Sequence, residues 1–199
     1  MTDAGDEIAA TAARLVVEEG MEYGPAKRRA ARDLGRRSGR SATLPSNEAV
    51  EDEVRAYLAL FCADTQPAEL RALREVALLW MQRLAEFRPH LSGAAWRGTA
   101  TRLSAVHLDL YCDDPKSAEI AVINGGVDYD VASIDRPGRE PVNVLVVASH
   151  SRALNDSVTV QLALHDLDDQ RGALKPDAQG RTWRGDLPAL QRLLAAEAA

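Results

Sequence analysis

Hydrophobic residues in the first half of the chain recur every three or four positions, a spacing typical of amphipathic helices. A first helix is predicted up to Gly20, which would cap its C-terminal end. A second helix is predicted over residues 26–34, with Pro25 in its first turn. Residues 36–43 are polar and rich in Ser and Gly, so we expect a linker there.

Two further helices are predicted before the pattern changes. The third begins at Ser46 or Asn47, either of which can cap it, and the fourth runs from Pro67 to Pro89. The fourth helix has the broadest apolar face of the chain, formed by Leu70, Leu73, Val76, Leu79, Trp80, Leu84 and Phe87.

In the second half, apolar and polar residues alternate, as they do in β-strands. Strands are predicted over residues 106–111, 127–131, 142–147 and 157–164, and helices over residues 115–124 and 189–196. This order predicts an α+β fold: a mixed sheet of about four strands with flanking helices, preceded by a helical region. We therefore expect an N-terminal helical region over residues 1–66 and an α/β core over residues 67–199.

Composition places the chain among soluble proteins. Of its 199 residues, 46% are hydrophobic and 27% are charged. The N-terminus does not resemble a signal peptide, and no apolar run approaches the ~20 residues that span a bilayer. Cys62 and Cys112 are isolated and have no metal-ligand spacing. These features, with the Ala- and Arg-rich composition, predict a bacterial cytoplasmic protein that does not bind membranes.

The net charge of −6 hides a basic segment. Residues 24–40 hold seven basic side chains and only one acidic side chain. Such a segment is either a solvated helix face or a surface for RNA or a protein partner. No aromatic side chain suited to stacking on single-stranded bases lies among its key residues, which are Lys27, Arg28, Arg29, Arg32 and Arg36.

The strongest motif is a turn followed by a strand. The small-residue turn Gly98-Thr99 precedes Ser104, which opens the strand over residues 106–111, and Asp113-Asp114 follow that strand. This layout resembles the polymerase β-like nucleotidyltransferases over about residues 67–165. In that family a Gly-Ser turn holds the nucleotide phosphates, and a Ser-Asp-x-Asp strand carries ligands for Mg²⁺. The resemblance therefore implies a nucleotide and Mg²⁺ as ligands.

The carboxylates that the family chemistry requires are replaced in this chain. Two carboxylates separated by one residue on a strand point to the same side and hold the metal ions. Here these positions are Ala105 and His107, and histidine is a poor ligand for Mg²⁺. A third carboxylate is expected on a neighbouring strand, where the polar residues are Thr159 and Gln161. We therefore favour a catalytically degenerate nucleotidyltransferase-like protein that binds a nucleotide or a partner.

The resemblance also assigns candidate residues. Gly98 and Thr99 match the phosphate-binding turn, and Ser104 matches the serine that precedes the first carboxylate. Two arginines that flank the turn, Arg97 and Arg102, are candidates for clamping phosphates.

An alternative is an active enzyme with a shifted metal site. In that case Asp109 with Asp113 or Asp114 would hold a single metal ion, and His107 with Asp109 would form an acid–base pair. Against it, an aspartate immediately before Pro115 is a common helix N-cap.

Overall fold

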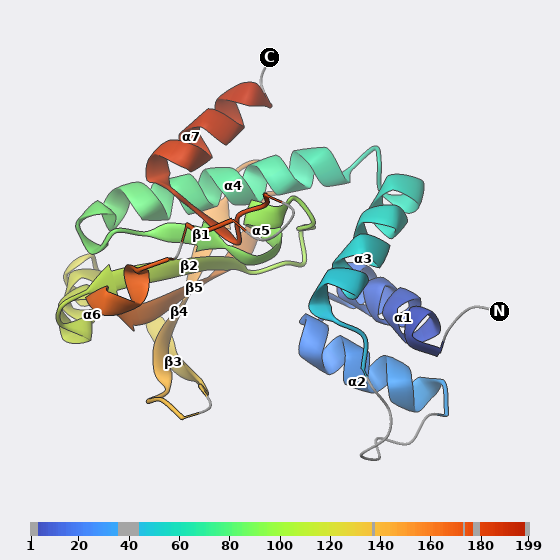
Figure 1. Ribbon diagram of the computed structural model, residues 1–199. Coiled ribbons are helices and arrows are strands. Elements are labelled where there is room, and N and C mark those ends of the chain that lie inside the picture. The colour runs from blue at the N-terminus through green and yellow to red at the C-terminus, as the bar shows by residue number, and fades with distance from the viewer. Residues whose placement is uncertain (1–3, 36–43, 137, 173, 177–179, 198–199) are drawn as a thin grey trace. The chain divides into compact units, whose positions relative to one another are not determined.

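The structure is a computed structural model that describes residues 4–35, 44–136, 138–172, 174–176 and 180–197. It divides into two compact units, Met1–Pro67 and Ala68–Ala199. The first unit contains three helices: α1 (Ala4–Glu19), α2 (Tyr23–Asp33) and α3 (Asn47–Phe61) (Figure 1). Within the described ranges, no helix has the length and apolarity needed to cross a membrane.

The helical unit has its own small core. Helix α1 contacts both α2 and α3, and the buried side chains include many alanines, which let the helix backbones approach closely. The Ser46 hydroxyl accepts a hydrogen bond from the Ala49 N–H at 3.1 Å, so Ser46 is the cap of α3. The predicted helices of this region are confirmed. Its core residues are Ile8, Ala9, Ala12, Ala13, Leu15, Val17, Ala26, Ala30, Ala31, Val50, Val54 and Leu58.

The second unit is built on a six-stranded mixed sheet with the order β3-β4-β5-β2-β1-β6. Only β2 and β5 pair in parallel, and the other neighbours are antiparallel. The predicted α+β class is confirmed, although the sheet has two more strands than predicted. The strands are β1 (His90–Ser92), β2 (Val106–Cys112), β3 (Tyr129–Ile134), β4 (Val142–Ser151), β5 (Asp156–Asp166) and β6 (Arg184–Asp186).

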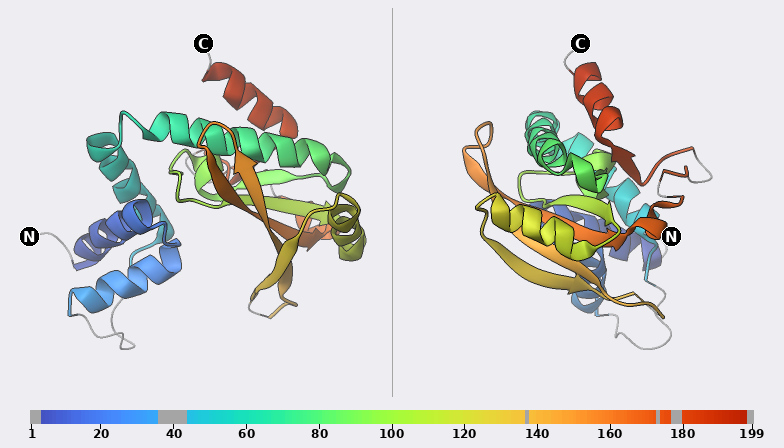
Figure 2. Two further views of the ribbon diagram at one scale, coloured as in Figure 1. Left: turned by 180° about the vertical axis from the view of Figure 1, so that it is seen from behind. Right: turned by 90° about the vertical axis from the view of Figure 1, so that its left-hand side faces the viewer.

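Helix α4 (Gln66–Arg83) runs along one face of this sheet (Figures 1 and 2). Its large apolar side chains pack against alternate residues of β2 and β5 in one core cluster, to which α6 and α7 also contribute. The remaining helices of the unit are η1 (Ala85–Phe87), α5 (Gly93–Arg97), α6 (Pro115–Asn124), η2 (Leu167–Gln170) and α7 (Leu187–Ala196).

Strand alternation gives the sheet two chemically different faces. On β2, Leu108 and Leu110 point into the core cluster, and Leu162 of β5 lies beside them. The intervening residues of β2, His107 and Asp109, therefore lie on the opposite face, where the polar side chains collect. This second face is where the candidate site lies.

The buried Arg74 of α4 ties three helices together. Its Nε donates to the carbonyl of Ala95 at 2.8 Å, its Nη2 donates to the carbonyl of Trp96 at 3.3 Å, and its Nη1 pairs with Glu197. Only 4% of Arg74 is exposed. Burial lowers the pKa of its guanidinium, and the charge of Glu197 opposes that shift.

We predict that Arg74→Met lowers the free energy of unfolding of the second unit by about 3 kcal/mol, because two carbonyls and a carboxylate lose a buried partner. Arg71→Met is the control, since Arg71 is 40% exposed, pairs with Glu75 on the surface and loses one hydrogen bond, at 3.3 Å to the Leu194 carbonyl. Urea denaturation followed by tryptophan fluorescence measures both variants. All three tryptophans of the chain lie in this unit. An equal, small loss in the two variants would contradict the prediction.

Candidate functional site

Polar residues form rows across the second face of the sheet. Ser92 of β1 is the register partner of His107 on β2, which is the partner of Gln161 on β5. One row further along, His90 pairs with Asp109. The sheet therefore brings His107 and Gln161 together, which are the positions where the family pattern expects metal-binding carboxylates.

Asp109 is the centre of a charged cluster on this face. His165 of β5 donates from Nε2 to Asp109 Oδ1 at 3.0 Å. Arg184 of β6 places its Nε 3.1 Å from Asp109 Oδ2, a close ion pair outside hydrogen-bond geometry. Arg184 Nη1 also donates to the Tyr111 hydroxyl at 3.1 Å. Tyr111 in turn stacks on the His165 ring, with centroids 5.3 Å apart.

These contacts set the charge states in the cluster. Burial by itself raises the pKa of the Asp109 carboxyl, but the hydrogen bond from His165 and the charge of Arg184 outweigh burial, so the pKa lies below its usual value. Burial, with the charge of Asp109, raises the pKa of Tyr111 to about 12. Near neutral pH the cluster therefore holds an ionised Asp109 against a cationic Arg184 and a neutral Tyr111.

Arg184 reaches Asp109 because β6 pairs with β1 in the sheet. In the register, Ser92 pairs with Arg184 and Leu91 pairs with Gly185. The ring of Trp96 packs directly on Gly185, where no Cβ intervenes. The Trp96 Nε1 donates to the Thr182 carbonyl at 3.1 Å, which holds the segment before β6 in place.

The structure places two small-residue turns near β2. Gly98 ends α5 in the left-handed conformation at φ 82°, and Thr99, which follows it, is buried. The other turn, Ser92-Gly93, begins α5. A Cβ on Gly93 would lie 3.1 Å from His107 Cδ2, so this turn touches the polar face directly. Gly93 also has a positive φ of 64°.

The other candidate residues for phosphate binding each contact another residue of the unit. The Ser104 hydroxyl accepts a hydrogen bond from the Thr101 N–H at 3.0 Å. Arg102 pairs with Asp156 at 3.2 Å. Arg97 lies over the ring of Trp183, 4.4 Å from its centroid. The assignment of these residues, and of Gly98-Thr99, to phosphate binding stays a prediction.

The carboxylates proposed for a shifted metal site lie at the end of β2. Asp113 and Asp114 are exposed, and Asp114 accepts the Lys116 N–H at 3.0 Å as the N-cap of α6. Among the residues that the structure describes, no three His, Cys, Asp or Glu side chains form a group that could hold a metal ion. Asp109 is already paired with a guanidinium. The donor set on the polar face therefore does not fit Mg²⁺.

The basic segment of the helical unit is described only up to residue 35, so Arg36 lies outside the described residues. Lys27 donates to the Pro45 carbonyl and to Asn47, and Arg29 pairs with Glu19. Arg28 and Arg32 are exposed. Binding of RNA or a protein through this segment stays a prediction.

Six residues of the polar face escaped the sequence analysis: His90, Ser92, Gly93, Tyr111, His165 and Arg184. The Ser-Gly pair was a detectable signal, because it is a second small-residue turn a few residues before Gly98. His165 and Arg184 gave no signal, since each lies more than fifty residues from Asp109 along the chain.

No protein-family model and no curated protein sequence matches this chain. Among solved structures, it is similar to Cid1 poly(U) polymerase bound to MgGTP, with a TM-score of 0.35 and 13% identity over 58% of this chain and 38% of that one. It is also similar to Cid1 in complex with the UTP analogue UMPNPP, with a TM-score of 0.35 and 10% identity over 58% of this chain and 36% of that one. The matched part thus spans less than two fifths of those proteins. Similarity at this level does not assign the chain to a family.

Proposed function

We propose that the protein is a catalytically degenerate member of the nucleotidyltransferase-like class, and that it binds a nucleotide without metal-dependent transfer chemistry. The observation that carries this proposal is the Asp109 cluster. The one carboxylate that β2 presents on the polar face is paired with Arg184 and His165. Phosphoryl and nucleotidyl transfer need metal ions to stabilise the charge that spreads over the phosphates.

The same face retains features suited to phosphates. The missing Cβ of Gly93 leaves room for the His107 ring, which a Cβ would approach to 3.1 Å, so the Ser92-Gly93 backbone and His107 lie together on this face. Arg184 contributes a guanidinium whose planar donors match phosphate oxygens. We therefore assign the role of phosphate-approaching turn to Ser92-Gly93 and keep Gly98-Thr99 as the alternative.

Calorimetric titration of the full chain with ATP and GTP, in Mg²⁺ and then in EDTA, tests this function. We expect saturable binding whose Kd changes by less than about twofold on removal of the metal, because no carboxylate pair holds it. Tightening of about tenfold in Mg²⁺ would show that a metal site survives and would overturn the degeneracy. Absence of binding in both conditions would overturn the nucleotide-binding proposal.

A pair of glycine variants distinguishes the two turns. Gly93→Ala and Gly98→Ala both place a Cβ on a residue with positive φ, so both variants carry backbone strain. Gly93→Ala in addition places its Cβ 3.1 Å from the His107 ring on the polar face. We expect Gly93→Ala to weaken ATP binding by about tenfold and Gly98→Ala to leave it nearly unchanged. The reverse result would assign the phosphate to Gly98-Thr99. Circular dichroism spectra of both variants check that each is folded.

A further inference from the structure

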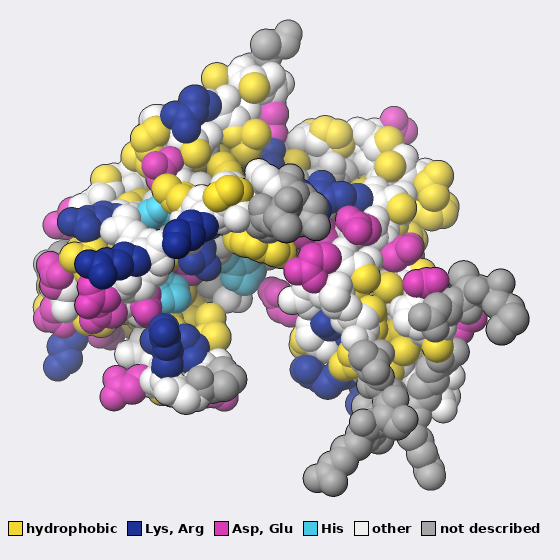
Figure 3. Space-filling view, in the orientation of Figure 1, with side chains coloured by type: hydrophobic (Ala, Val, Ile, Leu, Met, Phe, Trp, Pro, Cys, Tyr) yellow, Lys and Arg dark blue, Asp and Glu magenta, His cyan; other side chains and the backbone are white. Residues whose placement is uncertain are grey.

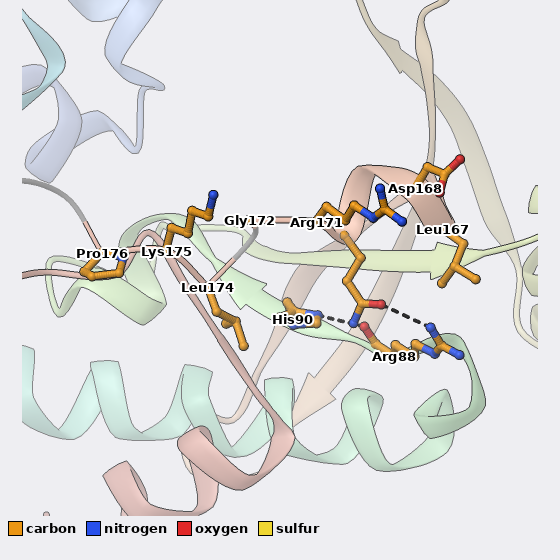
Figure 4. Close-up of a pocket in the computed structure, with 10 residues that line it drawn as sticks. Arg88, His90, Leu167, Asp168, Arg171, Gly172, Leu174, Lys175 and Pro176 are labelled. Carbon is orange, nitrogen blue, oxygen red and sulfur yellow. Dashed lines mark hydrogen bonds between the residues drawn. The ribbon is translucent and has the colours of Figure 1, made fainter.

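A cationic cleft lies beside the polar face, at the other end of β1 from the Ser92-Gly93 turn. It has a volume of about 720 Å³ and is open to solvent (Figure 4). Arg88 and His90 contribute to it from the start of β1, and the other residues come from η2 and the segment that follows. The size is within the range of small-molecule sites.

The charges that line this cleft are unbalanced. Three cationic side chains, Arg88, Arg171 and Lys175, face one carboxylate, that of Asp168. The neighbouring Asp169 does not offset them, because it is paired with Arg136 and Arg139. The excess stands out in a chain whose net charge is −6. In Figure 3, Lys and Arg side chains gather around the histidines over this part of the unit.

One cation of the cleft is held in place by the protein. Arg88 adopts the left-handed conformation at φ 48° and ψ 56°, which is uncommon for a residue with a side chain. The buried His90 donates from Nδ1 to the Arg88 carbonyl at 2.8 Å, and Arg88 Nη1 donates to Gln170 Oε1 at 3.2 Å. The first contact fixes the carbonyl of Arg88 and the second fixes its guanidinium, so this cation is held in position in the wall of the cleft (Figure 4).

The other two cations of the cleft, Arg171 and Lys175, lie on the segment after η2. The side chains of Arg171 and Lys175 form no ion pair or hydrogen bond with another residue in the described part of the chain, and both residues are exposed. The lining also has an apolar portion, formed by Leu167, Leu174 and Pro176. No Phe, Tyr or Trp lines the cleft, so it offers none of these rings for stacking on a nucleobase.

We propose that this cleft is a binding site for a small organic phosphate, separate from the nucleotide site. The phosphate group lies between Arg88 and Arg171, whose guanidiniums supply charge-assisted hydrogen bonds, and Lys175 adds positive charge from the opposite side of the cleft (Figure 4). The carbon portion of the ligand covers Leu174 and Pro176.

Titration of the full chain with inorganic phosphate and with phenyl phosphate tests the proposal at low ionic strength. We expect both probes to bind saturably, and phenyl phosphate to bind about tenfold more tightly, because its ring covers the apolar wall. Equal affinities would show that free phosphate is the ligand and would overturn the organic portion of the proposal. No saturable binding of either probe would overturn the site itself.

Charge-matched double variants distinguish the loss of contacts in the cleft from a change in the overall charge of the protein. Arg171→Gln with Lys175→Gln is expected to weaken phenyl phosphate binding by about tenfold or more. The control, Arg83→Gln with Arg152→Gln, removes the same charge elsewhere in the unit and is expected to change the Kd less than about twofold. Equal weakening in both double variants would overturn the site.

A competition experiment tests whether the cleft is separate from the nucleotide site. Phenyl phosphate is expected to bind with an unchanged Kd when ATP is present at saturation. Displacement of one ligand by the other would overturn the separation, whereas failure of ATP to bind at all would leave the titration with phenyl phosphate as an independent test.

Discussion

Replacement of Gly185 by alanine is expected to lower the free energy of unfolding of the second unit by about 3 kcal/mol. A Cβ at this position would overlap the six-membered ring of Trp96, with Cζ2 at 2.6 Å. The ring cannot move without cost, because its Nε1 donates to the carbonyl and to the hydroxyl of Thr182 at 3.1 and 3.2 Å. The clash therefore either displaces β6 or breaks these hydrogen bonds.

Denaturation in urea, followed by tryptophan fluorescence, measures the effect. Gly126→Ala is the control in the same unit, since a Cβ there meets nothing within 4 Å and only the backbone strain of its positive φ of 65° remains. A double-mutant cycle isolates the cause. In a Trp96→Leu background, which removes most of the ring, Gly185→Ala should cost much less. The same cost in both backgrounds would show that the ring is not the obstacle.

Asp109→Asn is the second substitution with a large expected effect. It removes the charge that faces Arg184 but keeps the shape of the side chain. We expect the free energy of unfolding at pH 7 to fall by about 2 kcal/mol. This is less than for a fully buried pair, because Arg184 is 30% exposed and water can solvate its guanidinium when the carboxylate is removed.

The shifted pKa of Asp109 determines how the loss of stability in Asp109→Asn changes with pH. The pKa of the Asp109 carboxyl is lower in the folded protein than the value of about 3.9 in unfolded chains. Its ionisation therefore contributes stability that is fully present above about pH 4 and is lost as the pH falls through the folded pKa. The difference between wild type and Asp109→Asn should be constant between about pH 5 and pH 8 and should shrink below about pH 4.

Urea denaturation at several pH values measures this difference. Asp156→Asn is the control, because Asp156 is an exposed carboxylate whose pair with Arg102 is screened by solvent. We expect little change in stability for this variant at any pH. If the two variants behave alike, or if Asp109→Asn is as stable as wild type at pH 7, the ion pair with Arg184 does not stabilise the fold.

Long, periodic segments were predictable from the chain alone. Helix α4 has Leu70, Leu73, Val76 and Trp80 at helical spacing and buries all four, and apolar and polar residues alternate along β2, so local pattern predicted both elements. Burial was predicted less well, because Leu79 is 51% exposed and Asp109 is buried. The strands β1 and β6 were missed, because each is only three residues long and neither carries a full alternation. Both exist because they pair with neighbours in the sheet.

Part of the candidate site was also predictable from the sequence, and part was not. Residue identity alone predicted that Ala105 and His107 stand where the nucleotidyltransferase pattern has its paired carboxylates, and that the strand would present His107 and Asp109 on one face. Metal binding by paired carboxylates depends on two acidic residues at a fixed spacing within one strand. The sequence alone shows whether those residues are present.

Only the tertiary structure decided what Asp109 faces. Its partners come from strands that lie on either side of β2 in the sheet order, His165 on β5 and Arg184 on β6, beyond β1. Strand order and register depend on the packing of the whole sheet against α4 rather than on any local pattern. The sequence therefore determined which carboxylates are missing, and the fold determined that the remaining one is neutralised by a cation, because contacts between distant segments form only when the sheet is assembled.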